Sequence, residues 1–161
     1  MSFPAPFDSG EGEVLPEWID ANDHMNLAYY IVLFDLATDA IYEVFDIGPA
    51  YKTRANCGTF AAETHNLYEQ ELLLGERVRI NTFVLGVDAK RLHLAHEMFR
   101  LSDGARAATQ ELMYLHVDLA ARKVSPWPDI VRARLEEARL AHAALPRPTW
   151  IGRRVAMPAA R

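Results

Sequence analysis

The ten residues from Asp20 to Tyr29, D-A-N-D-H-M-N-L-A-Y, place two acids, a histidine and two asparagines directly before a long apolar segment. If that segment is a helix, the polar cluster lies at its N-terminus. There the unpaired backbone N–H groups and the positive end of the helix dipole favour negative charge. Such a cluster can carry out acyl-transfer chemistry, and it can equally serve as a helix cap alone.

The apolar segment from Leu27 to Phe45 predicts a helix that is buried on nearly every side. At about 1.5 Å per residue it would be about 30 Å long, enough to form the centre of a small domain. Gly48-Pro49 favours its termination. Its polar exceptions fall at spacings of three and four residues and define one narrow stripe: Asp35, Thr38, Asp39 and Tyr42.

Beyond Gly58 the hydrophobic period changes from helical to two, which is typical of strands. Strands are predicted at residues 11–15, 59–70, 77–84, 92–99 and 109–117. Short joins between consecutive long strands favour an antiparallel meander. After Pro126-Trp127-Pro128, Asp129 is expected to cap a second helix over residues 130–142. The fold class expected is α+β, a long central helix wrapped by a curved antiparallel sheet.

Composition indicates an ordinary globular protein of 161 residues, half of them hydrophobic, with a net charge of −5. The acidic balance argues against a nucleic-acid partner. The single Cys57 allows no internal disulfide, and no signal peptide or membrane span is expected, so a cytoplasmic location is predicted. We expect a flexible N-terminal arm at residues 1–10, one folded domain at 11–125, and a C-terminal helix and tail at 126–161.

The motif Asp20-x-x-x-His24-Met25-Asn26-x-x-Tyr29, followed later by Tyr68 and G-E-R-V at 75–78, resembles hot-dog-fold acyl-CoA thioesterases of the 4-hydroxybenzoyl-CoA type. The order of elements agrees from about residue 13 to about residue 120. The stretches D-A-N-D-H-M-N and F-A-A-E-T-H are similar to thioesterases that accompany carnitine dehydrogenase and act on betainyl-CoA. The resemblance implies a hot-dog fold, a homodimer or homotetramer with its site at a subunit interface, and no cofactor beyond the coenzyme A of the substrate.

The resemblance assigns catalytic roles around the long helix. Asp20 would act as nucleophile or general base on the thioester, and the backbone N–H of Leu27 would receive the developing oxyanion. His24 and Asn26 would orient these groups. One departure concerns Asp23, because many family members have Gly there; the division of labour between Asp20 and Asp23 is therefore open.

A second acid, Glu63, could reach the site across a dimer interface. Its spacing from His65 places both on one face of a strand, and a polar pair within the sheet is a slightly simpler explanation. Thr64 would then face the other way and could contact substrate. The helix carboxylates Asp35, Asp39 and Glu43 offer a further option, although a solvated stripe explains them more simply.

Substrate-binding candidates follow from the chemistry of the substrate. A betainyl group carries a trimethylammonium, which aromatic rings bind well. The candidate rings are Trp18, which precedes Asp20 closely, and Tyr29, Tyr30, Tyr68 and Trp127. Coenzyme A is anionic, and its phosphates need local positive charge. The candidates are Arg77, Arg79, Lys90 and Arg91, which should cluster at one end of the sheet if the meander is correct.

Two other functions fit parts of the pattern. A hot-dog hydroxyacyl-thioester dehydratase would pair a histidine with an acid, and His24 with Glu63 could imitate that pair. A non-catalytic acyl-CoA-binding domain needs no catalytic group at all. A metal enzyme is not indicated, because His93 and His96 are three apart in a strand and face opposite ways.

Overall fold

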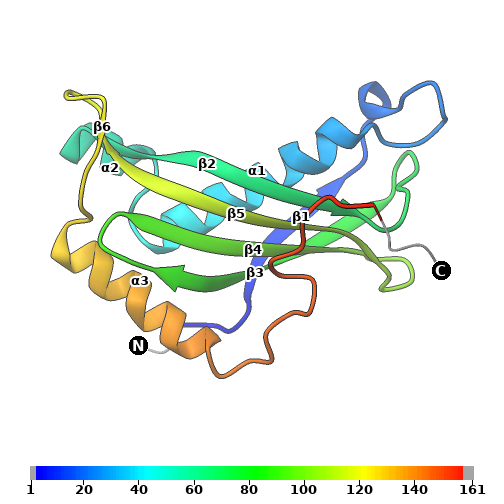
Figure 1. Ribbon diagram of the computed structural model, residues 1–161. Helices are drawn as coiled ribbons and strands as arrows, with labels where there is room; N and C mark the ends of the chain where they lie inside the picture. The colour runs from blue at the N-terminus through cyan, green and yellow to red at the C-terminus, as the bar shows by residue number, and fades with distance from the viewer. Residues whose placement is uncertain (1–2, 158–161) are drawn as a thin grey trace.

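The computed structural model describes residues 3–157. Within them, a long helix, α1 (Leu27–Val44), lies across one face of a six-stranded antiparallel sheet of order β1-β3-β4-β5-β2, with β6 paired to β5 (Figure 1). The strands are β1 (Phe7–Glu13), β2 (Cys57–Tyr68), β3 (Arg77–Val87), β4 (Arg91–Arg100), β5 (Arg106–Asp118) and β6 (Lys123–Val124). The other helices are η1 (Pro16–Trp18), α2 (Pro49–Ala55) and α3 (Asp129–His142).

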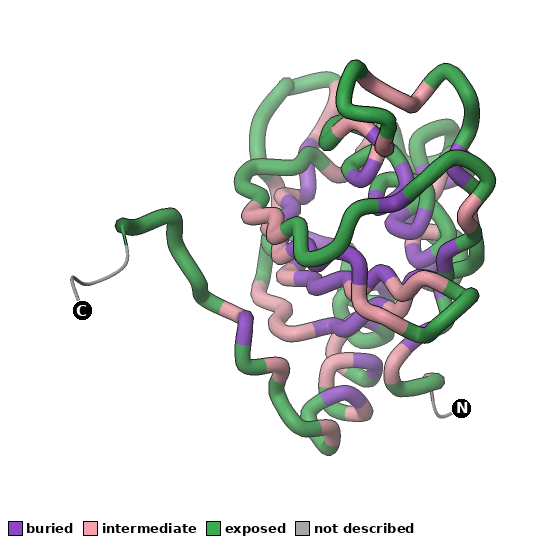
Figure 2. The backbone as a smooth tube through the Cα atoms, turned by 90° about the vertical axis from the view of Figure 1, so that its right-hand side faces the viewer, coloured by how far each residue is buried: buried purple, intermediate pink, exposed green. Residues whose placement is uncertain are grey.

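Helix α1 agrees with the prediction to within one residue, and the sheet curls around it as expected. Its inward side chains, among them Phe34 and Ile41, are almost wholly buried. They divide between two hydrophobic clusters that fill the space between helix and sheet, where Figure 2 shows the buried backbone gathering. Truncating a side chain such as Phe34 to Ala should cost about 3–5 kcal/mol.

A polar network crosses this core beneath α1. His96 on β4 bonds Thr38 of α1 through Nε2 at 3.0 Å and Thr82 of β3 through Nδ1 at 2.8 Å. Ser9 on β1 bonds the same Thr82 hydroxyl. Burial lowers the pKa of His96 to about 3, so the ring is neutral at physiological pH. The network therefore ties the helix to three strands without burying a charge.

The first strand begins four residues earlier than predicted. β1 starts at Phe7, and both Phe7 and Ser9 are buried, so part of the expected arm at residues 1–10 belongs to the sheet. The alternation was masked by an irregularity in the pairing between Asp8 and Glu11, where Gly10 has a φ of +103°. Residues 1–2 of that arm lie outside the described residues.

The meander prediction holds for β3, β4 and β5 but is wrong for β2. β2 pairs with β5 at the opposite edge, with Thr64 opposite Leu112, instead of lying beside β3. β1 takes the place beside β3, and this closes the sheet around α1. The segment before β2 forms the short helix α2, and α3 begins at Asp129 with Pro128, not Asp129, at the cap position.

α3 packs against β3, and its buried Val131, Leu135 and Ala138 join the cluster that contains Phe45. The chain then crosses the face of the sheet that points away from α1 (Figure 1). Trp150 is anchored there by an Nε1–H bond of 3.0 Å to Glu97. No helix within residues 3–157 is long and apolar enough to cross a membrane.

Candidate active site

The turn before α1 is closed by backbone hydrogen bonds. The Asp20 N–H donates to the His24 carbonyl at 3.0 Å, and the Asp23 N–H donates to the Asp20 carbonyl at 3.1 Å. Asp23 has a φ of 62° and an exposed side chain. That backbone region suits Gly best and tolerates Asp. Asp23 therefore occupies a turn position at which Gly also fits. This geometry indicates that Asp23 serves to shape the turn.

Asp20 is held in place by its neighbours in this turn. Its Oδ1 accepts the Asn22 N–H at 2.8 Å, and its Oδ2 lies 3.4 Å from the Asn26 Nδ2 donor. The first contact is strong and the second is long, so Oδ2 is the oxygen that is freer to react. Asp20 itself is partly buried, which leaves it reachable from solvent.

Asn26 caps α1 and leaves one donor open. Its side-chain oxygen accepts the Ala28 N–H at 3.0 Å, and its backbone carbonyl accepts the Tyr29 N–H at 3.0 Å. The N–H of Leu27 has no acceptor among the described residues. The turn thus holds a carboxylate in contact with the Asn26 side chain and a free N–H on the next residue, the two kinds of group that an acyl-transfer site needs.

A pocket of about 350 Å³ opens beside this turn. Tyr30 and Tyr68 meet edge to face there, with ring centroids 5.2 Å apart, and the Tyr30 hydroxyl donates to the Gln70 carbonyl at 3.1 Å. Burial raises the pKa of both tyrosines, so they are neutral at physiological pH. The pocket is lined by His24, Met25, Leu27, Tyr30, Tyr68, Glu69, Gln70 and Glu71.

The structure therefore brings His24, Leu27, Tyr30 and Tyr68 together, next to Asp20. Residues 69–71 were missed by sequence reasoning. They follow the last residue of β2, and their only sequence signal was the pair of acids directly after Tyr68. The Met25 N–H donates to the Leu72 carbonyl at 2.8 Å, and this bond holds the loop after β2 against the turn.

The other aromatic candidates lie elsewhere. Trp18 and Tyr29 stack on each other, with ring centroids 5.1 Å apart and planes 11° from parallel, so they do not offer their facing sides to a ligand. Trp18 lines a different pocket, between β1 and α1. Trp127 is buried in the core against His116, where it cannot contact a substrate at the turn. The proposal that Trp127 joins a cage is therefore wrong.

Glu63 and His65 share one strand face, as predicted, and that face points away from α1. Both line a pocket of about 330 Å³ with His93 and Glu111, whose side chains are 2.8 Å apart. Thr64 lies on the other face, opposite the core residue Leu112. Glu63 and Asp20 line no common pocket within one chain, and His93 and His96 do face opposite ways.

The expected cluster of basic residues does not form. Arg77 and Arg79 lie at the start of β3 and pair with Glu11, whereas Lys90 and Arg91 lie in the turn at the far end of the same strand. Arg91 is paired with Asp88 at 2.6 Å. The prediction of one shared cluster is wrong because β3 runs the full width of the sheet between the two pairs.

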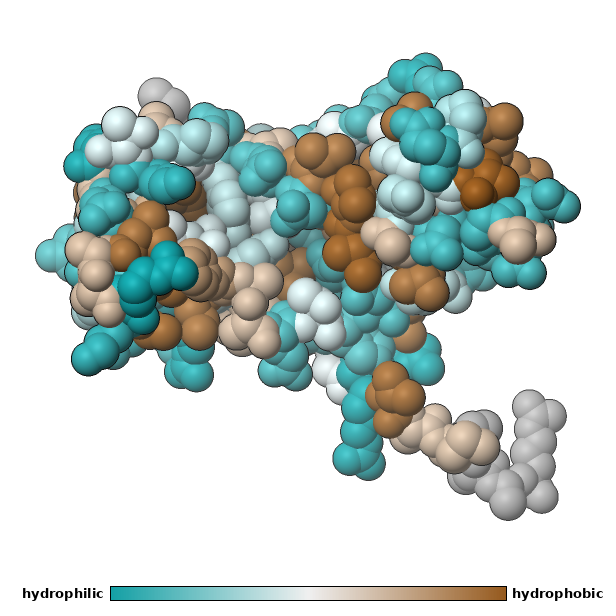
Figure 3. Space-filling view, turned by 90° about the horizontal axis from the view of Figure 1, so that it is seen from above, coloured by the Kyte–Doolittle hydropathy of each residue, from teal (hydrophilic) through white to brown (hydrophobic). Residues whose placement is uncertain are grey.

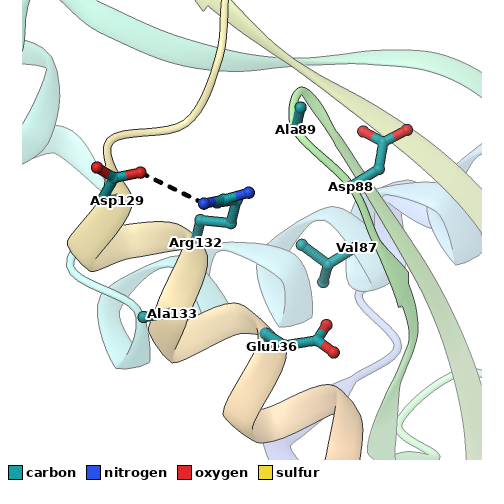
Figure 4. Close-up of a pocket in the computed structure, with 7 residues that line it drawn as sticks. All are labelled: Val87, Asp88, Ala89, Asp129, Arg132, Ala133 and Glu136. Carbon is teal, nitrogen blue, oxygen red and sulfur yellow. Dashed lines mark hydrogen bonds and ion pairs between the residues drawn. The ribbon is translucent and has the colours of Figure 1, made fainter.

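A pocket of similar size, about 360 Å³, lies between α3 and the turn from β3 to β4 (Figure 4). Its acids already have partners. Asp129 bonds Arg132 at 3.4 Å, as the dashed line in Figure 4 shows, Glu136 bonds Arg139 and Asp88 bonds Arg91. Its lining residues are all different from those of the pocket beside the turn.

The fold and the polar turn are those of a hot-dog thioesterase, and the chain belongs to the thioesterase-like superfamily, whose family model matches residues 14–135. This confirms the predicted fold and the predicted class of enzyme, an acyl-CoA thioesterase. In sequence, the chain is 36% identical over 151 residues to a betainyl-CoA thioesterase of Pseudomonas aeruginosa, covering 94% of this chain and 95% of the relative. It is 35% identical to an L-carnitine dehydrogenase/betainyl-CoA thioesterase of Rhizobium meliloti, covering 86% of this chain and 28% of that longer protein.

Solved structures agree with this placement. A putative thioesterase from Pseudomonas putida superposes with a TM-score of 0.82 at 31% identity, covering 98% of this chain and all of the other. A hypothetical protein from Staphylococcus aureus, solved in complex with CoA, superposes with a TM-score of 0.88 at 23% identity and similar coverage. The second likeness establishes the shared fold alone.

Proposed function

We propose that this protein hydrolyses betainyl-CoA to betaine and coenzyme A, with Asp20 as its reactive carboxylate. The observations that carry the proposal are the Asp20 carboxylate, which Asn26 contacts in the turn before α1, and the open N–H of Leu27, a residue that lines a pocket with aromatic rings. The similarity to betainyl-CoA thioesterases along nearly the whole chain supports the choice of acyl group.

The chemistry can follow either of two routes. As general base, Asp20 takes a proton from water, the water oxygen attacks the thioester carbonyl, the C–S bond breaks, and the proton passes to the departing thiolate. As nucleophile, Asp20 Oδ2 attacks the carbonyl, expels the thiolate, and forms an anhydride that water then cleaves. In both routes the Leu27 N–H stabilises the oxyanion, while His24 and Asn26 orient the reacting groups.

The acyl group would enter the pocket beside the turn. Tyr30 and Tyr68 supply aromatic faces and edges there, and neither Lys nor Arg is among the described residues that line the pocket. Both features favour a cation over an anion. Tyr30 and Tyr68 therefore replace Trp18 and Tyr29 as the preferred contacts for the trimethylammonium group.

We propose further that the protein is at least a homodimer joined through β2. Among the described strands, β2 is a twelve-residue edge strand that pairs on one side only. Long open edges invite pairing with a second copy. Exposed apolar side chains lie on this strand, including Phe60 and Tyr68, and the space-filling view from above in Figure 3 shows apolar residues at the surface. A tetramer would bury further surface.

In such a dimer Thr64, on the face toward α1, would approach the partner's site more readily than Glu63, which points the other way. Lys90 is exposed and its side chain has no ion-pair partner among the described residues, so it could meet the phosphates of coenzyme A. Arg91 is paired with Asp88, and Arg77 and Arg79 are paired with Glu11. Substituting Lys90 by Ala should raise KM for the CoA ester, while the same change at Arg77 should not.

The decisive test is thiol release from a panel of acyl-CoAs, including betainyl-CoA and butyryl-CoA. We expect free CoA from both, with higher kcat/KM for betainyl-CoA. A preference for butyryl-CoA would reject the betainyl assignment. A dehydratase would convert hydroxyacyl-CoA without freeing thiol, and a binding domain would show no turnover. His24 and Glu63, the pair that a dehydratase would need, line separate pockets within one chain.

A further inference from the structure

Two glutamates, Glu69 and Glu71, line the pocket beside the turn, and they differ in whether an arginine pairs with their carboxylate. Both oxygens of Glu69 are held by Arg106, with N–O distances of 2.8 and 2.9 Å. Arg106 also contacts Glu97 at 2.8 Å, so it is fixed between two acids on neighbouring segments. The carboxylate of Glu69 is therefore engaged within the protein, and it can contribute less than an unpaired acid to binding a further cation.

In Glu71, by contrast, the backbone is held by an arginine and the carboxylate is not. Its backbone carbonyl accepts a hydrogen bond from Arg100 at 3.2 Å, and Arg100 is itself anchored by Asp103 at 2.7 Å. Within residues 3–157, no hydrogen bond or ion pair engages the carboxylate of Glu71. The backbone of Glu71 is thus fixed while its charge stays available at the wall of the pocket.

The position of Glu71 relative to the aromatic pair is also informative. Glu71 lines the same pocket as Tyr30 and Tyr68. After burial, its negative charge is among the causes that raise the pKa of the Tyr30 hydroxyl. A cation resting against the two rings would therefore lie within reach of one uncompensated carboxylate, and aromatic contact and opposite charge would act on it together.

We propose that Glu71 is the residue that selects a cationic acyl group over a neutral one of the same shape. This inference rests on the proposed betainyl-CoA hydrolysis and adds the group that supplies the charge discrimination. The tyrosine rings favour a trimethylammonium group over a neutral tert-butyl group only modestly, through cation–π attraction. Only the free carboxylate distinguishes the two strongly, and because Glu71 is exposed to solvent, its effect should weaken as salt is added.

The test compares betainyl-CoA with 3,3-dimethylbutyryl-CoA, in which carbon replaces the quaternary nitrogen. The readout is the ratio of kcat/KM for the two esters in each variant, so that their different intrinsic reactivities cancel between variants. We expect Glu71→Gln to lower this ratio by roughly fivefold to tenfold, mainly through KM for betainyl-CoA, as expected for one charge pair near a protein surface. The loss should shrink at high salt.

Glu69→Gln is the matched control, because it removes the same charge from the same pocket. In Glu69→Gln the ratio of kcat/KM for the two esters should stay within about twofold of the ratio in the unchanged protein. Losing the Arg106 pair should nevertheless lower Tm. An unchanged ratio in Glu71→Gln, or equal losses in both variants, would overturn the assignment to Glu71. If the unchanged protein hydrolyses dimethylbutyryl-CoA but not betainyl-CoA, the proposed function itself fails, and with it the selection of a cation.

Discussion

The pocket at the start of α1 and the pocket beneath α3 have nearly the same volume, about 350 and 360 Å³, and use their polar groups in opposite ways. Beneath α3 each lining acid is paired with an arginine three residues further along the chain: Asp129 with Arg132, as Figure 4 shows, Glu136 with Arg139, and Asp88 with Arg91. At the start of α1 the Leu27 N–H and the Glu71 carboxylate are left open. The two pockets are therefore alike in size and differ in whether a lining carboxylate is left unpaired.

The largest loss of activity is expected when the Asp20 carboxylate, at the start of α1, is removed. We expect Asp20→Asn to lower kcat for betainyl-CoA by roughly 10² to 10⁴, the usual range for a positioned base. Asp129→Asn, in the pocket beneath α3, is the control and should stay within about twofold. Steady-state thiol release measures both, and Tm should be nearly unchanged in both. Substantial activity in Asp20→Asn would remove Asp20 from the mechanism.

The buried His96 makes a prediction about pH. The unfolded chain has an ordinary histidine pKa near 6.5, whereas the folded chain holds the pKa of His96 at about 3. Between these values the unfolded chain binds the extra proton, so lowering the pH through this window destabilises the fold. NMR titration of the His96 ring should show it neutral down to about pH 4. A ring that titrates near 6.5 in the folded protein would contradict the buried network.

Two variants of Asn26 can distinguish a role in capping α1 from a role in catalysis. Asn26→Ala removes both the cap of α1 and the contact with Asp20, so it should cost about 1 kcal/mol in stability and lower kcat as well. Asn26→Ser keeps a capping oxygen and should restore Tm while kcat stays reduced about tenfold, if the Asp20 contact orients the carboxylate. Equal recovery of Tm and kcat in Asn26→Ser would show that the residue acts through the helix alone.

The smallest effect is expected beneath α3. Glu136→Gln breaks an exposed pair with Arg139, and exposed pairs contribute about 0–1 kcal/mol. The kcat/KM for betainyl-CoA should not change, and the urea midpoint should shift only slightly. A marked loss of activity would mean that this pocket takes part in substrate binding, against the contrast drawn between the two pockets.

Features that depend on neighbouring residues could be predicted from the sequence, whereas features that join residues far apart in the chain could not. α1 and the turn before it were predicted because their signals are local, a dense helical period preceded by capping residues. The place of β2 beside β5 was missed because strand pairing joins residues far apart in the chain. The prediction of a basic cluster was wrong for the same reason, because Arg77 and Lys90 lie near opposite ends of β3.

The residues of the pocket show the same division. His24 and Leu27 were found because they belong to the turn, and Tyr68 because it belongs to the second element of the resemblance. Glu69 and Glu71 were missed because nothing local shows that the loop after β2 is bonded to the turn through Leu72. Only the fold shows that one of these acids is paired and the other is free.

The most direct test of the central claim is where the substrate binds. Two-dimensional ¹H–¹⁵N NMR of the Asp20→Asn variant, titrated with betainyl-CoA, follows each backbone amide while turnover is slowed. The account predicts a large downfield shift of the Leu27 amide, as its N–H bonds the thioester oxygen, with no change at Ala133 beneath α3. Shifts centred on Ala133 and absent at Leu27 would contradict it.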